Sequence, residues 1–449
     1  MFRRVLVANR GEIAVRVIRT CREMGIRSVA VYSEADADSL HVRLADEAVC
    51  IGPAPAAESY LKIPAILSAA EVSNADAIHP GFGFLSENAH FAEVCSDCGF
   101  RFIGPSPAVI RRMGDKSAAR DAMKAAGVPV TPGSDGTVAN LEDALAVASR
   151  LGYPVLVKAS AGGGGKGMRS ASGPLEMAQA WNTASSEAAR AFGDGSCYVE
   201  KLVPRARHIE VQLAADARGN VWALGDRDCS LQRRHQKVLE ETPAPGLSEA
   251  ARKKLAKTAV AAAKAGGLDS VATVEFLWDE AAKAFYFMEM NTRIQVEHTV
   301  TEETTGLDLV KAQILAAAGE ELKARDWNVP PSGCAIEVRV NAEDPSRNFA
   351  PTPGRVTDLR LPGGPGVRVD THLYPGCDVP PSYDSLLAKI VVRANNRPEA
   401  LARMRRALRE FHVEGVSTTV PFAQSLLEDA RFLKGDYDTR FLERFLEES

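Results

Sequence analysis

The sequence predicts an α/β region at the N-terminus, followed by α+β units that carry longer helices. Residues 1–103 alternate short apolar runs with helical stretches, and this alternation favours a parallel, doubly wound sheet. Near residue 160 a predicted strand runs directly into a glycine-rich loop. The rest of the chain carries β-hairpin patterns, which require antiparallel strands.

The first 103 residues justify the α/β prediction element by element. The first helix is expected over 13–24 and ends at Gly25, since glycine accepts the left-handed backbone that follows many helices. The turn before it, Asn9 to Ala14, lacks the G-x-G-x-x-G pattern, so no dinucleotide is implied. Strands are expected over 4–8, 28–32, 77–80 and 100–103.

Two stretches divide the remaining chain: 105–107, with two prolines, and 129–136, with two prolines and two glycines. We expect an N-terminal domain over 1–103, a helical linker over 104–130, a small α+β unit over 131–203 and a larger unit over 204–449. In the small unit Asn140 is an N-cap for a helix over 141–151. In the larger unit Pro398 starts a helix whose apolar stripe we assign to the core: Leu401, Met404, Leu408 and Phe411.

Composition excludes several classes of function. The 449 residues are 45% hydrophobic and 25% charged with a net charge of −4, so no basic field indicates nucleic acid. No apolar run is long enough for a membrane helix, and the N-terminus lacks the apolar core of a signal peptide. Eight cysteines in so long a chain indicate reduced thiols and a cytoplasmic protein. Cys95 and Cys98 form an isolated C-x-x-C, interpreted as ordinary cysteines rather than a zinc site.

The glycine-rich loop is the first candidate binding element. Consecutive glycines follow the strand that ends at Lys158, and Lys166 lies inside the loop. Exposed backbone N–H groups between two lysines suit a phosphate, although a flexible surface turn would have the same composition. Lys166 precedes Gly167 rather than serine or threonine, so the loop is not a Walker A motif.

Acidic residues form the second candidate site. A hairpin centred on Ala282 would place Glu275 directly opposite Glu289, with Asn291 on the same face as Glu289. Facing carboxylates repel each other unless a cation lies between them, and oxygen ligands suit Mg²⁺. An exposed acidic edge is the alternative.

Two further segments offer charged faces. If 293–297 is extended, Arg293, Gln295 and Glu297 point the same way, so that an arginine fork could hold a planar anion beside a carboxylate base. If 232–237 is one strand, Arg233, His235 and Lys237 share a cationic face. A solvated, salt-bridged strand is the alternative for both.

Taken together, these segments resemble biotin carboxylases of the ATP-grasp superfamily along essentially the whole chain. The motifs that carry the resemblance are 8–14, 79–88, 113–116, the glycine-rich loop, 227–237, 289–298 and 337–344. The resemblance implies an ATP-grasp fold with an N-terminal Rossmann-like domain, a mobile lid at 131–203 and a C-terminal α+β domain. The sequence departs from many members at Phe82, where tyrosine is frequent, and at Lys166, where arginine is frequent.

The resemblance also implies roles for individual residues. ATP phosphates would be contacted by Lys116, Lys158, Gly163, Gly164, Gly165, Lys166, Gly167 and His235, and Met168 would also bind ATP. Adenine would be held by Glu200, Lys201 and Leu202, and the ribose side by His208 and Gln232. Mg²⁺ or Mn²⁺ would bind Glu275, Glu289 and Asn291, and Glu275 and Glu289 would also contribute to ATP binding. Bicarbonate would bind Lys237, Arg293, Gln295 and the backbone of Val296; Glu297 would be the base, and Arg339 would stabilise the biotin enolate.

The implied reaction is carboxylation of biotin by ATP and bicarbonate through carboxyphosphate. Ala122-Met123-Lys124-Ala125 resembles a biotinylation motif, but its helical context argues against that role, so biotin is expected on a separate carrier protein. The resemblance implies a homodimer working with a carrier and a carboxyltransferase. Acetyl-CoA carboxylase is the first expectation, and a split pyruvate carboxylase or another acyl-CoA carboxylase stays open. A different ATP-grasp ligase, or a non-catalytic ATP-binding subunit, is the alternative outside this family.

Overall fold

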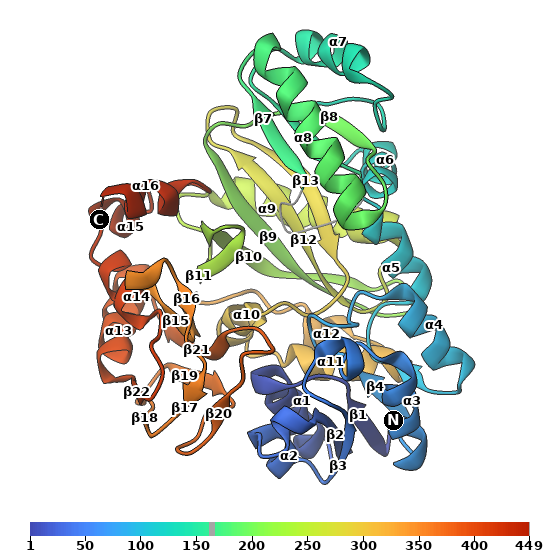
Figure 1. Cartoon of the computed structure of the whole chain (residues 1–449), viewed down its shortest axis with the longest axis vertical. Helices are drawn as coiled ribbons and strands as arrows, with labels where there is room; N and C mark the ends of the chain where they lie inside the picture. Colours follow the sequence, from blue (N-terminus) through green and yellow to red (C-terminus); the bar gives the residue numbers. More distant parts are fainter. Residues whose placement is uncertain (161–166, 449) are drawn as a thin grey trace.

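The computed structural model describes residues 1–160 and 167–448. Figure 1 shows a parallel sheet at the N-terminal end, a long antiparallel sheet in the centre, and a small sheet at the opposite end from the N-terminal one. The mixture of a parallel sheet with antiparallel units confirms the predicted fold class. No helix in the described part of the chain has both the length and the hydropathy of a membrane span.

The N-terminal sheet has five parallel strands in the order β3-β2-β1-β4-β5. The inner strands β1 and β4 are buried along almost their whole length, because apolar clusters cover both faces of the sheet, as expected of a parallel sheet. The strand at 47–52 was not predicted, and the first helix starts two residues earlier than expected. Its elements are β1 (Arg4–Val7), α1 (Gly11–Glu23), β2 (Arg27–Ser33), α2 (Leu40–Leu44), β3 (Glu47–Gly52), α3 (Ile63–Val72), β4 (Ala77–His79), α4 (Ala89–Asp97) and β5 (Arg101–Phe102).

Two helices, α5 (Pro107–Gly114) and α6 (Lys116–Ala125), lead to the small sheet, whose order is β7-β6-β8. The predicted N-cap is confirmed, since the Asn140 side chain accepts from the backbone N–H of Asp143 at 3.0 Å. Lys124 lies on helix α6 and pairs with Asp135, so the helical context expected for that motif is also confirmed. The elements of this unit are α7 (Leu141–Leu151), β6 (Val155–Ala159), β7 (Met168–Ala171), α8 (Pro174–Phe192) and β8 (Cys197–Lys201).

The central sheet has eight antiparallel strands in the order β13-β12-β9-β10-β11-β14-β21-β19. Its strands are β9 (Ala206–Ala215), β10 (Val221–Arg233), β11 (Gln236–Thr242), β12 (Val271–Asp279), β13 (Ala284–Asn291), β14 (Cys334–Asn341), β19 (Val367–Thr371) and β21 (Leu386–Ala394). The helices inserted between them are α9 (Glu249–Gly266), α10 (His298–Thr305), α11 (Leu309–Ala317) and α12 (Ala324–Trp327).

The C-terminal residues pack against the β14–β21 end of this sheet (Figure 1). Pro398 lies in the first turn of α13, and the predicted stripe of that helix is buried in the largest apolar cluster, which confirms its core assignment. The helices here are α13 (Arg397–Glu410), α14 (Val420–Leu426), α15 (Ala430–Lys434) and α16 (Phe441–Glu448). The short strands are β15 (Glu343–Asp344), β16 (Ala350–Pro351), β17 (Gly354–Arg355), β18 (Asp358–Arg360), β20 (Asp378–Val379) and β22 (His412–Glu414).

Candidate active site

The β12–β13 hairpin places two carboxylates side by side, as the sequence predicted. Glu275 pairs in register with Glu289, and Asn291 ends the same strand opposite Thr273. A register shift just after Glu275 changes the pairing toward the turn, so the predicted centre at Ala282 holds only for the half of the hairpin that carries these side chains. Lys116 Nζ lies 3.1 Å from the Glu289 carboxylate.

Lys237 is surrounded by carboxylates from three other elements. Its ammonium donates to Glu297 at 2.6 Å, to Glu210 at 2.7 Å and to Glu275 at 3.0 Å. Burial works against the charge, but Glu210, then Glu275 and Glu297, raise the pKa of Lys237 well above its ordinary value. The lysine therefore stays charged and draws these carboxylates together.

Glu297 links Lys237 to Arg339. One carboxylate oxygen accepts from Lys237, and the other accepts from Arg339 Nη2 at 2.9 Å. Burial alone would raise the pKa of Glu297, but Lys237, helped by Arg339 and Arg227, holds that pKa below its ordinary value. The carboxylate is thus ionised at neutral pH, as a proton acceptor must be.

The guanidinium of Arg339 is fixed from a second side by Glu240. Arg339 Nε donates to Glu240 Oε1 at 2.6 Å. Burial raises the pKa of Glu240 to about 7, although Arg339 opposes the rise. Arg339 therefore lies between two carboxylates, Glu240 with a raised pKa and Glu297 with a lowered pKa.

The prediction that the backbone is extended from Arg293 to Glu297, with Arg293, Gln295 and Glu297 on one face, is wrong. Strand β13 ends at Asn291, the following residues form a loop, and Glu297 is the N-cap residue of α10. The side chains still converge because the loop folds back over the hairpin: Gln295 Nε2 donates to Glu275 at 2.9 Å. Arg293 Nε donates instead to Glu87 of the N-terminal unit at 2.8 Å.

The predicted cationic strand face of Arg233, His235 and Lys237 is also wrong. Arg234 and His235 form a two-residue hairpin turn with φ of +49° and +67°, the backbone that such a turn requires. Lys237 therefore pairs with Gln232 and shares its face, whereas Arg233 points away to Glu343 at 2.8 Å. The turn holds neither glycine nor asparagine, so no local sequence signal marks it.

One cavity of about 340 Å³ collects most of the predicted residues; we call it the central cavity. The predicted residues that line it are Lys116, Lys158, Met168, His208, Gln232, His235, Lys237, Glu275, Glu289, Asn291, Arg293, Gln295, Val296, Glu297 and Arg339. Gly163, Gly164, Gly165 and Lys166 lie outside the described residues.

The predicted adenine residues do not line the central cavity but lie on strand β8 and just after it. Glu200 pairs with Lys158, which does line it, at 3.1 Å and with Arg120 at 2.8 Å. Lys201 Nζ donates to the carbonyl oxygens of Gly152 and Tyr153, and Leu202 follows the strand end.

Gly167 has a φ of +71°, and a Cβ there would come within 2.8 Å of Ala159, so glycine is required at that position.

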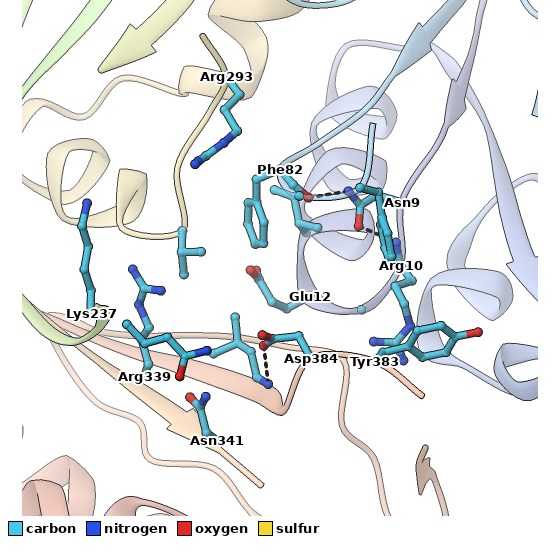
Figure 2. A pocket seen from close by; sticks show the side chains of 17 residues that line it. Asn9, Arg10, Glu12, Phe82, Lys237, Arg293, Arg339, Asn341, Tyr383 and Asp384 are labelled. Atoms are coloured by element: carbon cyan, nitrogen blue, oxygen red, sulfur yellow. Dashed lines mark hydrogen bonds between the residues drawn. The ribbon is translucent and has the colours of Figure 1, made fainter. Parts of the chain in front are cut away.

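A second cavity of about 360 Å³ lies between the N-terminal unit and strands β14 and β21; we call it the interface cavity. Figure 2 shows Glu12 and Phe82 on one side of it and Arg339 and Lys237 on the other. The residues shared with the central cavity are Gln236, Lys237, Arg293, Val296 and Arg339. The two cavities therefore meet at the Lys237–Glu297–Arg339 bridge.

Sequence reasoning missed several residues of this network. Glu210 and Arg227 are fully buried and pair at 2.6 Å. Glu210 also accepts from Lys237, and Arg227 also donates to Gln295. A signal in the sequence could have found them: polar residues alternate with apolar ones along β9, a fully buried strand. A polar side chain buried in a sheet needs a hydrogen-bond partner, so this alternation indicates a polar network. Asn9, Glu12 and Tyr383 of the interface cavity came together only through tertiary structure.

Three family models match the chain in succession. Residues 1–110 match "Biotin carboxylase, N-terminal domain", residues 115–325 match "Carbamoyl-phosphate synthase L chain, ATP binding domain", and residues 337–444 match "Biotin carboxylase C-terminal domain". Together with the fold, this defines an ATP-grasp ligase. "Biotin carboxylase 1" of Bacillus subtilis is 53% identical over 445 residues, covering 99% of both chains. The chain belongs to the biotin carboxylase family.

Solved structures agree with the sequence comparison. The biotin carboxylase–β-γ-ATP complex from Campylobacter jejuni matches with a TM-score of 0.96 and 48% identity over 99% of each chain. The biotin carboxylase domain dimer of Hydrogenobacter thermophilus 2-oxoglutarate carboxylase matches with a TM-score of 0.94 and 47% identity over 99% of this chain and 98% of that one. That dimer is a complex with MgADP, ADP and bicarbonate.

Proposed function

We propose that this biotin carboxylase uses ATP and bicarbonate to carboxylate biotin carried on a separate protein, through carboxyphosphate. The observation that carries the proposal is the bridge from Lys237 through Glu297 to Arg339, which lies where the two cavities meet. A base at that junction is within reach of an anion activated in the central cavity and of an acceptor entering from the interface cavity. The β-γ-ATP and bicarbonate complexes of the relatives support the choice of substrates.

The central cavity suits a nucleotide with Mg²⁺ or Mn²⁺. Glu275, Glu289 and Asn291 offer hard oxygen ligands from adjacent strands, and Lys116 at 3.1 Å already balances the Glu289 charge, so the place accepts a cation. These residues therefore fit a divalent metal, which would offset charge on the phosphates during transfer. In the same proposal, Lys116, Lys158 and His235 contact phosphates, and Met168 lines the nucleotide site.

For the other nucleotide contacts, His208 and Gln232 face the ribose side of the central cavity, with Glu200, Lys201 and Leu202 beside adenine. His208 is held by Glu275 at 3.2 Å and by Gln232, so its ring has a fixed position at the cavity wall.

Bicarbonate would lie against Arg293, Gln295 and the backbone N–H of Val296, with Lys237 offsetting its charge. Glu297 takes its proton, and the oxygen so freed attacks the γ-phosphorus of ATP; ADP leaves and carboxyphosphate forms.

Carboxyphosphate then separates into CO₂ and phosphate. Phosphate takes the ureido proton of biotin, and the resulting enolate attacks CO₂ to form the C–N-linked carboxylate. Arg339, facing the interface cavity, offsets the enolate charge. Enclosure of these steps limits hydrolysis of carboxyphosphate.

For the larger assembly we propose a homodimer that works with a biotin carrier and a carboxyltransferase as the first half-reaction of acetyl-CoA carboxylase. The dimeric form of the Hydrogenobacter relative supports the first part. A split pyruvate carboxylase or another acyl-CoA carboxylase is the alternative, since a solved biotin carboxylase subunit of pyruvate carboxylase is also similar to this chain. Transfer of labelled carboxylate from the native complex to acetyl-CoA, rather than to pyruvate, separates them.

The reaction is tested by phosphate release from Mg-ATP and bicarbonate with and without free biotin, together with trapping of labelled carboxybiotin. We expect biotin-stimulated cleavage and labelled product that Glu297→Ala abolishes. Glu303→Ala is the matched control, since this half-buried residue lies on the same helix and does not line either cavity. ATP cleavage indifferent to biotin, with no labelled product, would indicate another ATP-grasp acceptor.

A further inference from the structure

A lysine outside both cavities contacts the backbone of the loop that carries the proposed bicarbonate contacts. Lys389 lies on β21 and is fully buried. Its ammonium donates to the carbonyl oxygen of Val296 at 3.0 Å and lies 3.1 Å from a carboxylate oxygen of Glu12. Asp370 of the neighbouring strand is 3.9 Å away.

The two peptide groups on either side of Val296 are therefore fixed by different elements. The carbonyl of Gln295, which belongs to the same peptide as the Val296 N–H, accepts from His298 Nδ1 at 2.7 Å and from the His298 backbone. The carbonyl of Val296 accepts from Lys389. With both carbonyls bound on the protein side, the N–H of Val296 has a set direction at the junction of the two cavities.

The charge on Lys389 is stable in this position. Burial disfavours it, but Glu12, then Glu337 and Asp370, raise the pKa of Lys389 above its ordinary value, while Arg368 acts the other way. A buried ion pair contributes little net stability compared with apolar residues of similar size, because desolvation offsets the attraction. A fully buried lysine whose hydrogen bond goes to a loop carbonyl is thus better explained by a need to orient that loop.

We infer that Lys389, held by Glu12, is a positioning residue that orients the Val296 peptide and thereby sets the affinity for bicarbonate. Lys389 comes from the central sheet and Glu12 from the first helix of the N-terminal unit. The pair therefore also ties the interface cavity, which Glu12 lines, to the loop at the central cavity. The inference rests on the proposed function, since it deepens the role given to Val296.

The test is the double variant Lys389→Met with Glu12→Gln, which leaves no unpaired buried charge. The matched control is Arg397→Met with Glu241→Gln, which removes a partly buried arginine and its buried carboxylate partner, joined at 2.6 Å, and which contacts neither cavity nor the loop. We expect the KM for bicarbonate to rise at least about tenfold in the double variant, as for loss of a hydrogen bond to an anion. The KM for ATP should stay within about twofold, since the nucleotide contacts are untouched.

Amide hydrogen exchange gives a readout that does not depend on activity. Exchange over residues 292–300 should quicken in the double variant and not in the control, because only the former loses the bond to Val296. If the double variant does not fold, Glu12→Gln alone keeps Lys389 but weakens its hold, and should raise the bicarbonate KM about threefold. An unchanged bicarbonate KM, or equal rises in the bicarbonate and ATP KM values, overturns the inference. Wild-type ATP cleavage that ignores bicarbonate would instead overturn the proposed function.

Discussion

Strands β14 and β21 have two faces that differ in kind. On one, Ile336, Val338, Ile390 and Val392 join the largest apolar cluster with helices α13 and α14. On the other, Arg339 and its neighbours along both strands contact α10 and the loop before it through charged groups.

The two faces differ in what holds them. Apolar burial on the first stabilises the fold roughly in proportion to the area removed from water. On the second, desolvation offsets most of what the ion pairs gain. These ionic contacts contribute little stability, yet they converge on the N-terminus of one helix, α10. They therefore indicate that the second face positions residues of the candidate site, whereas the first face stabilises the fold.

The largest effect should follow removal of a charge from the polar face. Arg339→Met should lower carboxybiotin formation at least about 100-fold, as for loss of a donor to developing negative charge. Labelled product formed per minute measures this. Arg393→Met, an exposed arginine on the same sheet, is the control and should stay near wild type. A loss of less than tenfold would remove Arg339 from the proposed chemistry.

The next effect should come from the apolar face and appear in stability. Ile390→Ala removes a fully buried side chain next to Lys389 and should lower the free energy of unfolding by about 2–5 kcal/mol. Urea unfolding measures the loss. The kcat of the folded fraction should stay within about twofold, since Ile390 faces away from α10. A large fall in kcat here would mean that the two faces are not separate in function.

A smaller effect should follow Glu240→Gln, which keeps an acceptor for Arg339 but removes the charge. Carboxybiotin formation should fall about tenfold, the value of a charged over a neutral hydrogen bond. The variant should also change how stability depends on pH. Between pH 4.5 and about 7 the folded wild-type carboxyl keeps a proton that the unfolded chain has lost, so wild-type stability falls across this window.

Glutamine lacks this dependence. Relative to wild type, the variant should therefore gain about 3 kcal/mol in unfolding free energy between pH 4.5 and pH 8. Parallel urea curves at the two pH values check the difference. Identical pH dependence in both proteins would show that burial does not raise the pKa of Glu240.

The smallest effect should be at the solvent side of α13. Arg406 and Glu410 form an ion pair at 2.8 Å between half-exposed side chains one turn apart. Arg406→Ala should cost only about 0.3–0.5 kcal/mol and leave the kinetics unchanged. Thermal unfolding at low and high salt measures it. A larger cost would mean that the bond from Arg406 to the carbonyl oxygen of Gly363, at 3.0 Å, contributes more than the ion pair.

Local patterns predicted much of the fold. The Asn140 cap, the stripe of α13 and the pairing of Glu275 with Glu289 all depend on residues close together in sequence, whose spacing fixes which face they share. The predictions that failed, a strand through His235 and an extended run from Arg293 to Glu297, assumed that alternation continues. A two-residue turn and a loop end it, and neither carries a glycine or proline to mark the break.

By itself the sequence determined the fold class, the resemblance to biotin carboxylases and most residues that line the central cavity, because these depend on motifs and on short-range periodicity. Only the tertiary structure decided that Lys237 gathers Glu210, Glu275 and Glu297, and that Lys389 joins Glu12 to Val296. Those contacts join strands, helix ends and a loop that are far apart in the chain. Buried charges must find partners wherever the packed sheet brings them, which no spacing along the sequence specifies.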